Sequence, residues 1–249
     1  MFNGKKIAVI LPAYNAARTL EKTVADIPRE IVDDIILVDD CSHDETVKIA
    51  EKINLYYVVH DKNLGYGGNQ KTCYKEALER GADIVVMLHP DYQYDPRLIP
   101  ALIALIAYGN YDMSIASRIL NGKCIKNGMP LYKYIANRFL TLIQNIVIRE
   151  KFSEYHSGYR AFSAPLLRAL PLERNSNNFI FDNQMFLQAL YYDYKVGEIS
   201  CSTRYEKESS SINFWRSCRY GLGVIKESFR YTLAKHGRVK SDLFSALKR

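Results

Sequence analysis

Short apolar runs of strand length alternate with helix-like segments through the first half of the chain, and this alternation constrains the fold more than any other feature. The strands are expected at residues 7–11, 35–38, 56–59, 84–88 and 113–116. Between them lie segments with apolar residues at helical spacing or with helix start and stop signals. A repeated strand–helix unit predicts an α/β fold: a doubly wound, mainly parallel sheet with helices on both faces.

Two of the intervening helices have clear start signals. Ser42 and Glu45 have the spacing of a capping box, which predicts a helix directly after them. Asp95 followed by Pro96 predicts an N-cap with proline at the first helical position. A further helix is expected over residues 69–80. No repeat, low-complexity stretch or linker divides the sequence, so we expect one globular domain.

Composition limits the class of protein. With 249 residues, 48% of them hydrophobic, the chain can build a large core. Its five cysteines are scattered, odd in number and never spaced as Cys-x-x-Cys, which argues against a disulfide framework or a structural zinc site and favours a reducing cytoplasm. No apolar stretch approaches the roughly 18 residues that span a bilayer. We therefore expect no membrane-spanning segment.

The positive charge is concentrated at the C-terminal end. From Arg204 onward there are eleven lysines and arginines against four acidic residues, which accounts for the whole formal charge of +7. This distribution predicts an anionic partner, such as phosphate groups, a lipid surface or nucleic acid, and the alternative is a solvated basic face. No nucleic-acid recognition motif is present, so nucleic acid is the least favoured of these partners.

Two segments have the pattern of amphipathic helices that lie on a membrane surface. Residues 213–249 form a basic segment in which apolar residues recur every three or four positions, namely Trp215, Cys218, Leu222, Ile225 and Phe229. Residues 131–148 are a second candidate. The alternative for both is an apolar stripe that covers the sheet.

Polar side chains follow two of the predicted strands. His89, Asp91 and Gln93 come after the run at 84–88 and are residue types that bind divalent cations. Asp39 and Asp40 end another strand, and paired carboxylates accept hydrogen bonds from the N–H of a base and from ribose hydroxyls. The carboxyl ends of parallel strands face the ligand crevice, so a nucleotide and its cation would meet there.

The turn after the first strand excludes two common nucleotide folds. A dinucleotide-binding fold would place Gly-x-Gly-x-x-Gly there, and a P-loop would place a glycine-rich turn with Lys and Ser or Thr. The chain instead has the sequence Pro-Ala-Tyr-Asn at residues 12–15.

The motifs together resemble those of a known family. Leu11-Pro-Ala-Tyr-Asn15, Val38-Asp-Asp-x-Ser42, Asn63-x-Gly65-x-Gly67-Gly-Asn69 and the Asp91 cluster resemble family 2 glycosyltransferases of the GT-A fold. His156-Ser-Gly-Tyr-Arg160, Phe181-Asp182-Asn-Gln184 and Thr203-Arg204-Tyr205 are similar to the polyprenyl-phosphate sugar transferases of the dolichol-phosphate mannose synthase type. The resemblance covers residues 5–222.

This resemblance implies roles for individual residues. The nucleotide pocket and donor phosphates would be contacted by Pro12, Ala13, Tyr14, Asn15, Asp39, Asp40 and Arg118. Lys207 would also bind phosphate, in the acceptor half. Asp91 would bind the Mn²⁺ or Mg²⁺ ion that bridges the diphosphate, with His89 and Gln93 beside it. Catalytic roles would fall to Asp91, Asp182, Arg160 and Arg204, the two arginines meeting phosphate charge in the acceptor half.

Two positions depart from the family pattern. The family usually has Asp-x-Asp where this chain has His89-Pro-Asp91, and an acidic residue where it has Ala16. Imidazole ligates manganese well but is a poorer ligand for magnesium. Either Asp91 carries metal binding and His89 is tolerated, or metal binding is weakened or lost.

The implied organisation is a single GT-A domain over residues 1–212, with a nucleotide-sugar half at 1–117 and an acceptor half at 118–212, followed by the basic helical segment. The implied function is inverting, metal-dependent transfer of a sugar from a UDP- or GDP-sugar to a polyprenyl phosphate at the cytoplasmic face of the membrane. Alternatives are transfer to a glycan hydroxyl with Asp182 as general base, and nucleotide-sugar binding without turnover. The sequence leaves open whether the chain forms a homo-oligomer.

Overall fold

The computed structural model describes residues 1–203 and 214–245. The strands are β1 (Ile7–Ala13), β2 (Asp34–Asp39), β3 (Tyr56–Val59), β4 (Ile84–Met87), β5 (Met113–Ser117), β6 (Arg160–Ser163) and β7 (Val196–Ser200). The α-helices are α1 (Leu20–Ala25), α2 (Thr46–Lys52), α3 (Tyr66–Glu79), α4 (Ile99–Ala107), α5 (Leu131–Ile148), α6 (Ala164–Ala169), α7 (Phe181–Tyr191) and α8 (Phe214–Lys235). Short 3₁₀ turns lie at Pro96–Leu98, Leu172–Arg174 and Asp242–Phe244.

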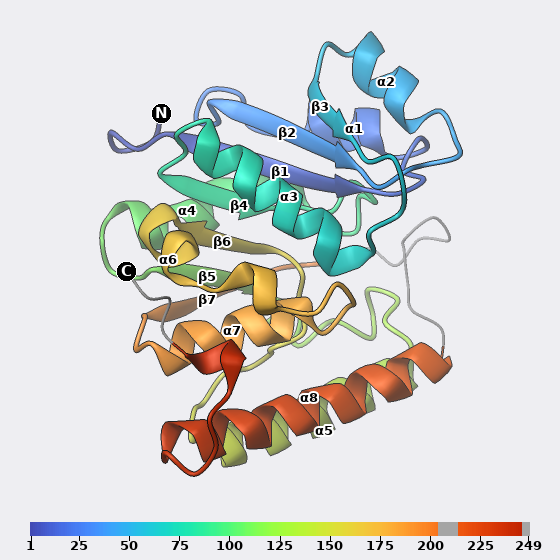
Figure 1. Cartoon of the computed structure of the whole chain (residues 1–249). Helices are drawn as coiled ribbons and strands as arrows, with labels where there is room; N and C mark the ends of the chain where they lie inside the picture. Colours follow the sequence, from blue (N-terminus) through green and yellow to red (C-terminus); the bar gives the residue numbers. More distant parts are fainter. Residues whose placement is uncertain (204–213, 246–249) are drawn as a thin grey trace.

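The strands form one seven-stranded sheet in the order β3-β2-β1-β4-β6-β5-β7 (Figure 1). All neighbouring pairs are parallel except those of β6, which runs antiparallel to both β4 and β5. The predicted doubly wound, mainly parallel sheet is therefore confirmed, and β6 and β7 are the strands that the sequence pattern did not predict. Of these two, β6 is the antiparallel one. Its four residues are all buried and carry no alternation that would distinguish a strand.

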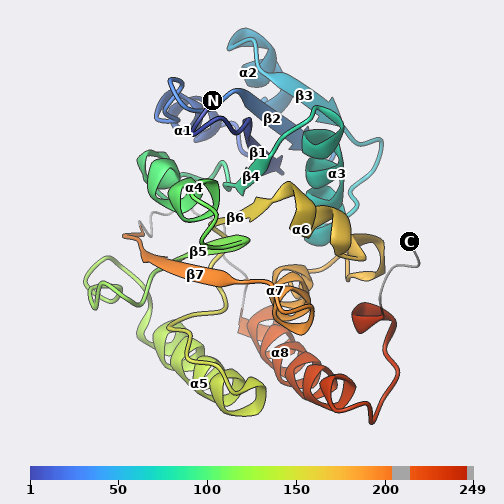
Figure 2. The same ribbon diagram turned by 90° about the vertical axis from the view of Figure 1, so that its left-hand side faces the viewer.

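Helices cover both faces of the sheet and enclose two apolar cores (Figures 1 and 2). The core on one face includes buried side chains of α3, α6 and α7, and the core on the other face includes those of α1 and α4. β1 is buried at all seven positions, as expected for a central strand covered on both sides. This arrangement leaves the carboxyl ends of β1, β2 and β4 as neighbours at one edge.

The ends of two helices differ from the sequence prediction. α2 begins at Thr46, and no capping box forms, because the hydroxyl of Ser42 accepts from the backbone N–H of Asn15. The N-cap is Glu45, whose side chain makes no capping bond, and the carboxylate of Asp44, one residue earlier, accepts from the N–H of Thr46 at 3.0 Å. In contrast, the predicted cap at Asp95 is present, since its carboxylate accepts from the N–H of Arg97 at 3.0 Å. At both helix starts, a nearby aspartate carboxylate accepts a hydrogen bond from a backbone N–H that has no partner within the helix.

α3 begins three residues earlier than predicted, and its first turn includes glycines. These glycines allow another chain segment to pack closely against the helix. A Cβ on Gly67 would lie 2.3 Å from the carbonyl oxygen of Ser176 and 2.8 Å from the Cβ of Phe181. The N–H of Gly67 also donates to the carbonyl of Asn177 at 2.8 Å. The glycine-rich segment thus admits the chain segment that leads into α7.

The helices α5 and α8 pack against one another along one side of the molecule, and α8 also contacts α7 (Figure 2). Of the two predicted amphipathic segments, 131–148 is therefore a helix throughout, and 213–249 is an α-helix over residues 214–235. The amphipathicity of α5 is inverted: Asn137, Thr141 and Gln144 are buried, whereas its exposed face carries Leu131, Ile135, Phe139, Leu142 and Ile146.

The apolar stripe of α8 also points outward. Trp215, Leu222 and Phe229 are 80%, 71% and 52% exposed. Neither stripe covers the sheet, so that alternative is wrong for both helices. Among the described residues, no helix is long and apolar enough to cross a membrane.

Candidate active site

The turns after β1 and β2 are joined to one another by hydrogen bonds. The N–H of Asn15 donates to the hydroxyl of Ser42, and the side-chain oxygen of Asn15 accepts from the N–H of His43. The N–H of Ala16 donates to the hydroxyl of Thr46 at 2.8 Å. The two strand ends therefore form one rigid rim. Ala16 contributes only its backbone N–H to this rim, where the family usually has an acidic side chain.

The predicted pocket residues of β1 divide into two groups at this rim. Pro12 and Ala13 are buried within the strand, whereas Tyr14 and Asn15 are exposed just beyond its end. The ring of Tyr14 stands edge-on to His43, with ring centroids 6.5 Å apart. Tyr14 and Asn15 are therefore the members of this group that a ligand at the rim could reach.

Asp39 has an unsatisfied acceptor. The residue is 1% exposed, and its Oδ2 accepts from the N–H of Ser42 at 2.8 Å. Its Oδ1 is buried and has no hydrogen-bond partner among the described residues. A buried carboxylate oxygen without a donor is costly. The position is suited to accept an N–H from a bound base.

The carboxylate of Asp40, by contrast, is occupied by the protein itself. Its Oδ1 accepts from the N–H of Leu64 and contacts Nδ1 of His60, both at 2.8 Å, and its Oδ2 accepts from the N–H of Gly65 at 3.0 Å. These bonds fix the turn that precedes α3. The structure thus gives Asp40 a part in building the pocket wall, with each of its two carboxylate oxygens already bonded to the protein.

The predicted metal ligands follow β4. Oδ1 of Asp91 accepts from the N–H of Gln93 at 3.1 Å. Nε2 of His89 lies 3.0 Å from the hydroxyl of Tyr66, and none of the described residues bonds to Nδ1 of His89. The side chains of His89, Asp91 and Gln93 are all partly exposed. They are accessible from the strand-end edge.

These ligands fit a cation that arrives with a diphosphate. Within residues 1–203 and 214–245, no group of three or more His, Cys, Asp or Glu side chains could hold a metal ion by itself. In phosphate-transfer sites, divalent cations are commonly held by one or two protein carboxylates, and phosphate oxygens and waters supply the remaining ligands. Asp91, His89 and Gln93 offer a carboxylate, an imidazole nitrogen and an amide oxygen for such a shared site.

Arg160 is buried, and its guanidinium bonds to the protein. The side chain is 1% exposed and donates to the carbonyl oxygens of Ser157, Tyr155 and Asp182. These bonds tie the loop before β6 to the first turn of α7. The phosphate contact predicted for Arg160 would require these bonds to rearrange.

Arg118 forms a buried ion pair with Glu154, a residue that the sequence analysis did not identify. Nε and the backbone N–H of Arg118 each donate to the Glu154 carboxylate at 2.8 Å, and its Nη2 forms a further contact there. Burial raises the pKa of Glu154, but the charge and hydrogen bonds of Arg118 outweigh this effect and hold the pKa below its ordinary value. Glu154 has no motif around it that would mark it in the sequence.

A second pair that the sequence did not indicate joins His156 to α8. Nδ1 of His156 lies 2.9 Å from the hydroxyl of Tyr220, and Nε2 of His156 is buried with no hydrogen-bond partner within residues 1–203 and 214–245. Burial lowers the pKa of His156 to about 3, against the opposing effect of Glu154, so the ring is neutral at ordinary pH. The residues predicted in the segment that follows, Arg204 and Lys207, lie outside the described residues.

Asp182 lies at the start of α7 and is 7% exposed. Its Oδ2 accepts from the hydroxyl of Tyr66 at 2.6 Å, and its Oδ1 is buried and has no hydrogen-bond partner in the part of the chain that the structure describes. Tyr66 therefore connects Asp182 to His89.

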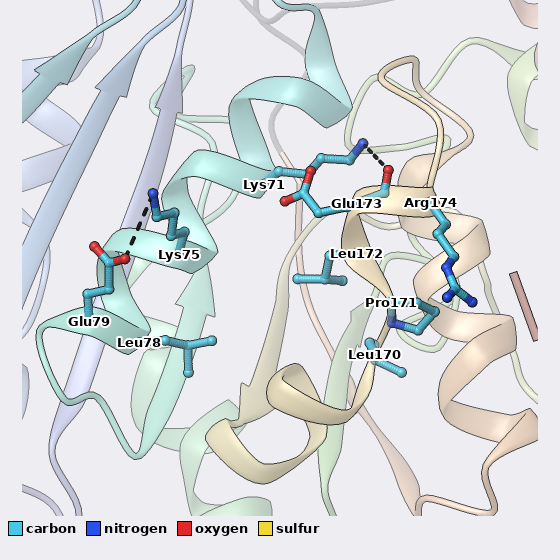
Figure 3. Close-up of a pocket in the computed structure, with 9 residues that line it drawn as sticks. All are labelled: Lys71, Lys75, Leu78, Glu79, Leu170, Pro171, Leu172, Glu173 and Arg174. Carbon is cyan, nitrogen blue, oxygen red and sulfur yellow. Dashed lines mark hydrogen bonds and ion pairs between the residues drawn. The ribbon is translucent and has the colours of Figure 1, made fainter. Parts of the chain in front are cut away.

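A surface groove lies away from this site, between α3 and residues 170–174 (Figure 3). It has a volume of about 310 Å³, and none of the predicted site residues lines it. Nζ of Lys71 donates to the carbonyl oxygens of Glu173 and Asn175, and Lys75 pairs with Glu79 at 3.8 Å. Because the groove contains none of the predicted site residues, we assign the candidate active site to the strand ends.

Comparison with solved structures supports the predicted architecture. The chain matches glucosyl-3-phosphoglycerate synthase from Mycobacterium tuberculosis, solved in complex with Mn²⁺, uridine diphosphate and phosphoglyceric acid, with a TM-score of 0.70. The match covers 96% of this chain and 81% of that chain at 17% sequence identity. At this identity the likeness shows the fold alone, and it confirms the predicted GT-A fold.

Two curated relatives resemble the chain in sequence. It is 29% identical over 252 residues to the UDP-N-acetylglucosamine--dolichyl-phosphate N-acetylglucosaminyltransferase of Methanococcus voltae, a match that covers 94% of this chain and 98% of the relative. It is 26% identical over 174 residues to the undecaprenyl-phosphate mannosyltransferase of Micrococcus luteus, covering 68% of this chain and 70% of the relative.

The model of one protein family matches most of the domain that carries the site. This model, described as glycosyl transferase family 2, matches residues 8–170 and so includes β1 to β6 and the whole strand-end edge. The chain therefore belongs to glycosyl transferase family 2.

Proposed function

We propose that the chain transfers a sugar from a nucleoside diphosphate sugar to a polyprenyl phosphate, with inversion at the anomeric carbon, at the cytoplasmic face of a membrane. The observation that carries the donor half of this proposal is the orphaned Oδ1 of Asp39, a buried acceptor at the rim of β1 and β2. Uracil and guanine each present a ring N–H that such an oxygen would accept. Tyr14 and Asn15 would flank the nucleoside from the end of β1.

Two observations support the acceptor half of the proposal: the names of the relatives, and the burial and hydrogen bonding of Asp182. Both curated relatives are named for transfer to dolichyl or undecaprenyl phosphate. A lipid phosphate is ionised near neutral pH and attacks without a base, whereas a glycan hydroxyl must lose a proton. The carboxylate of Asp182 is buried and already accepts from Tyr66, which disfavours it as a general base. The glycan alternative therefore ranks below the lipid phosphate.

The chemistry requires neutralisation of the leaving group. An oxygen of the acceptor phosphate forms a bond to the anomeric carbon from one face, while the bond to the nucleoside diphosphate breaks on the other and negative charge grows on the β-phosphate. A divalent cation held by Asp91, His89 and Gln93 together with the diphosphate supplies positive charge there when bound. Arg118, paired with Glu154 beside the β5 end, is the described arginine that we place nearest the donor phosphates, and Arg204 and Lys207 would meet the acceptor.

A membrane surface fits the exposed faces of α5 and α8. The outward side chains of α5 are apolar, and those of α8 include Trp215 and Leu222 beside the exposed cations Arg216, Arg219 and Lys226. Apolar surface flanked by basic residues binds anionic lipid, where a polyprenyl phosphate acceptor resides. This is the anionic partner that we favour for the basic C-terminal segment.

The test is a transfer assay with the full chain. Radiolabelled UDP- and GDP-sugars are incubated with the protein and Mn²⁺, with and without undecaprenyl or dolichyl phosphate, and the organic phase is analysed for labelled lipid. We expect lipid labelling with one donor and its loss by at least about 100-fold in Asp91→Ala. Glu79→Ala, which breaks an exposed ion pair far from the strand ends, is the matched control.

Other outcomes would separate the alternatives. Transfer to a soluble glycan but not to lipid would overturn the proposed acceptor. Nucleotide-sugar binding without any transfer would favour a binding protein without turnover. Full activity of Asp91→Ala would contradict the metal role of Asp91.

A further inference from the structure

Three side chains from distant parts of the chain form a continuous hydrogen-bonded series at the donor site. Oδ2 of Asp182, in α7, accepts from the hydroxyl of Tyr66, the first residue of α3, at 2.6 Å. The oxygen of Tyr66 lies 3.0 Å from Nε2 of His89, which follows β4. None of the described residues other than Tyr66 donates a hydrogen bond to the side chain of Asp182.

The direction of these bonds fixes the tautomer of His89. A tyrosine hydroxyl has one hydrogen, and a carboxylate can only accept. Since the hydrogen of Tyr66 goes to Asp182, the Tyr66 oxygen must accept from His89, which places the imidazole hydrogen on Nε2. The neutral ring then has its lone pair on Nδ1.

Packing holds the ring in this orientation. A Cβ on Gly158 would lie 2.9 Å from Nε2 and 3.0 Å from Cδ2 of His89, so the backbone of Gly158 closes one side of the ring. The ring of Tyr66 lies against His89 with centroids 5.4 Å apart, and Phe179 supports Tyr66 at 4.7 Å. On the opposite side of the ring, no described residue bonds to Nδ1. The imidazole is thus constrained at Nε2 and available at Nδ1.

We propose that Tyr66 and Asp182 are positioning residues that hold His89 in the Nε2–H form and present its Nδ1 as a ligand to the divalent cation of the donor complex. This inference rests on the proposed function for the cation and its diphosphate. It gives Asp182 a role other than general base. It also explains how the chain accommodates His89 where its family usually has aspartate, because an imidazole must have the correct nitrogen unprotonated to bind a metal ion, whereas either oxygen of a carboxylate can serve.

The first test determines the tautomer of His89 directly and requires no ligand, metal ion or turnover. The full chain is labelled with ¹⁵N-histidine, and the ring nitrogens of His89, assigned through His89→Gln, are observed by NMR. We expect the Nε2–H form in the wild-type protein and a mixture of tautomers in Tyr66→Phe and Asp182→Asn. Tyr74→Phe is the matched control, since it removes another buried tyrosine hydroxyl from the same helix, one that donates to Gln70. An Nδ1–H form in the wild type, or an unchanged spectrum in Tyr66→Phe, would overturn the proposal.

The second test measures how the protein binds the cation. Mn²⁺ affinity is measured by calorimetry in the presence of saturating UDP, and nitrogen coupling to the bound Mn²⁺ is measured by electron spin-echo spectroscopy. We expect Tyr66→Phe to weaken Mn²⁺ binding by about 10-fold, the lower end of the usual effect of an outer hydrogen-bond partner. We expect His89→Gln to abolish the nitrogen coupling, and Tyr74→Phe to change neither quantity. Unchanged affinity in Tyr66→Phe, or no nitrogen coupling in the wild type, would refute the cation role.

A double-substitution cycle separates positioning from general structural damage. In a His89→Asp background there is no tautomer to fix, so Tyr66→Phe should weaken Mn²⁺ binding by less than twofold. An equal loss in both backgrounds would mean that Tyr66 acts only through packing. Failure of sugar transfer with the tautomer and nitrogen coupling as expected would contradict the proposed function and leave the positioning role intact.

Discussion

Asp39 and Asp40 are adjacent and both buried, yet their carboxylates have opposite hydrogen-bonding states. One oxygen of Asp39 has no hydrogen-bond partner among the described residues, whereas both oxygens of Asp40 accept from the turn that precedes α3. Neighbouring residues of a strand point to opposite faces, so two identical side chains meet different surroundings. A paired-carboxylate motif can therefore combine one ligand-binding residue with one structural residue.

Asparagine substitutions should separate these two roles. Asp39→Asn should lower affinity for the matching nucleotide by about 10-fold or more, because a hydrogen bond to a charged group contributes about 1.5–3 kcal/mol. Asp40→Asn should lower the free energy of unfolding by about 2 kcal/mol through the weakened turn. Calorimetry with UDP and GDP in Mn²⁺ measures the first effect, and urea unfolding the second. Unchanged nucleotide binding by Asp39→Asn would remove this residue from the base site.

At the scale of elements, α5 is an amphipathic helix whose buried face is polar and whose exposed face is apolar. Its buried polar side chains have partners: the amide of Asn137 donates to Glu154 at 2.8 Å, and Gln144 faces Asn183. Its outward apolar side chains are exposed and do not pack against the sheet, unlike the apolar side chains of the helices that cover the sheet. An apolar face of this length on a water-facing helix is unusual in a monomeric protein and marks an interaction surface.

Phe139→Glu tests this surface without disturbing the fold. Phe139 is 59% exposed, so its substitution should change the free energy of unfolding by less than about 0.5 kcal/mol. Loss of its burial in lipid should weaken binding to phosphatidylglycerol vesicles by about 10-fold, from a contribution of about 1.5–3 kcal/mol. Sedimentation with vesicles measures the effect. Tyr108→Glu, at an aromatic position 64% exposed after α4, is the control. Equal loss in both variants would contradict a specific role for α5.

At the scale of the whole molecule, the interior near the site contains ionisable groups whose protonation is linked to folding. Glu154 is held ionised by Arg118, and His156 is held neutral by burial. Glu154 stabilises the fold above its unfolded pKa, and this contribution is lost as the pH falls through its lower folded pKa. The effect of His156 on stability begins at a higher pH. Its ordinary pKa is 6.5, whereas its pKa in the folded protein is about 3, so stability is lost as the pH falls below 6.5.

Stability should therefore fall on mild acidification. Between about pH 6 and pH 4.5 the unfolded chain binds a proton at His156 that the folded protein does not, so the free energy of unfolding should decrease by up to about 1.4 kcal/mol per pH unit. His156→Asn should remove this dependence, and His236→Asn, at an exposed position, should retain it. Urea unfolding at several pH values provides the measurement. A slope that is the same in wild type and His156→Asn would show that other groups are responsible.

The fold class and the place of the candidate site at the strand ends follow from the sequence, because strand and helix periodicity, strand ends and turn residues are local signals. The runs that became β1, β2 and β4 place Asn15, Asp39 and Asp91 at one edge through the geometry of a parallel sheet alone. The antiparallel β6 could not be predicted from its short, uniformly buried segment, since its pairing depends on neighbours distant in the sequence.

The partners of the side chains were decided only by the tertiary structure. Asp182 meets Tyr66 across 116 positions, and Arg118 meets Glu154 across 36. No local pattern encodes such pairs, because they form when separate elements pack into one interior. The sequence by itself thus determined which residue types stand at the strand ends. Packing decided whether a carboxylate oxygen stays without a partner among the described residues, as in Asp39, or is bonded to the protein, as in Asp40, because burial forces every polar group to find a partner or to keep a place for one.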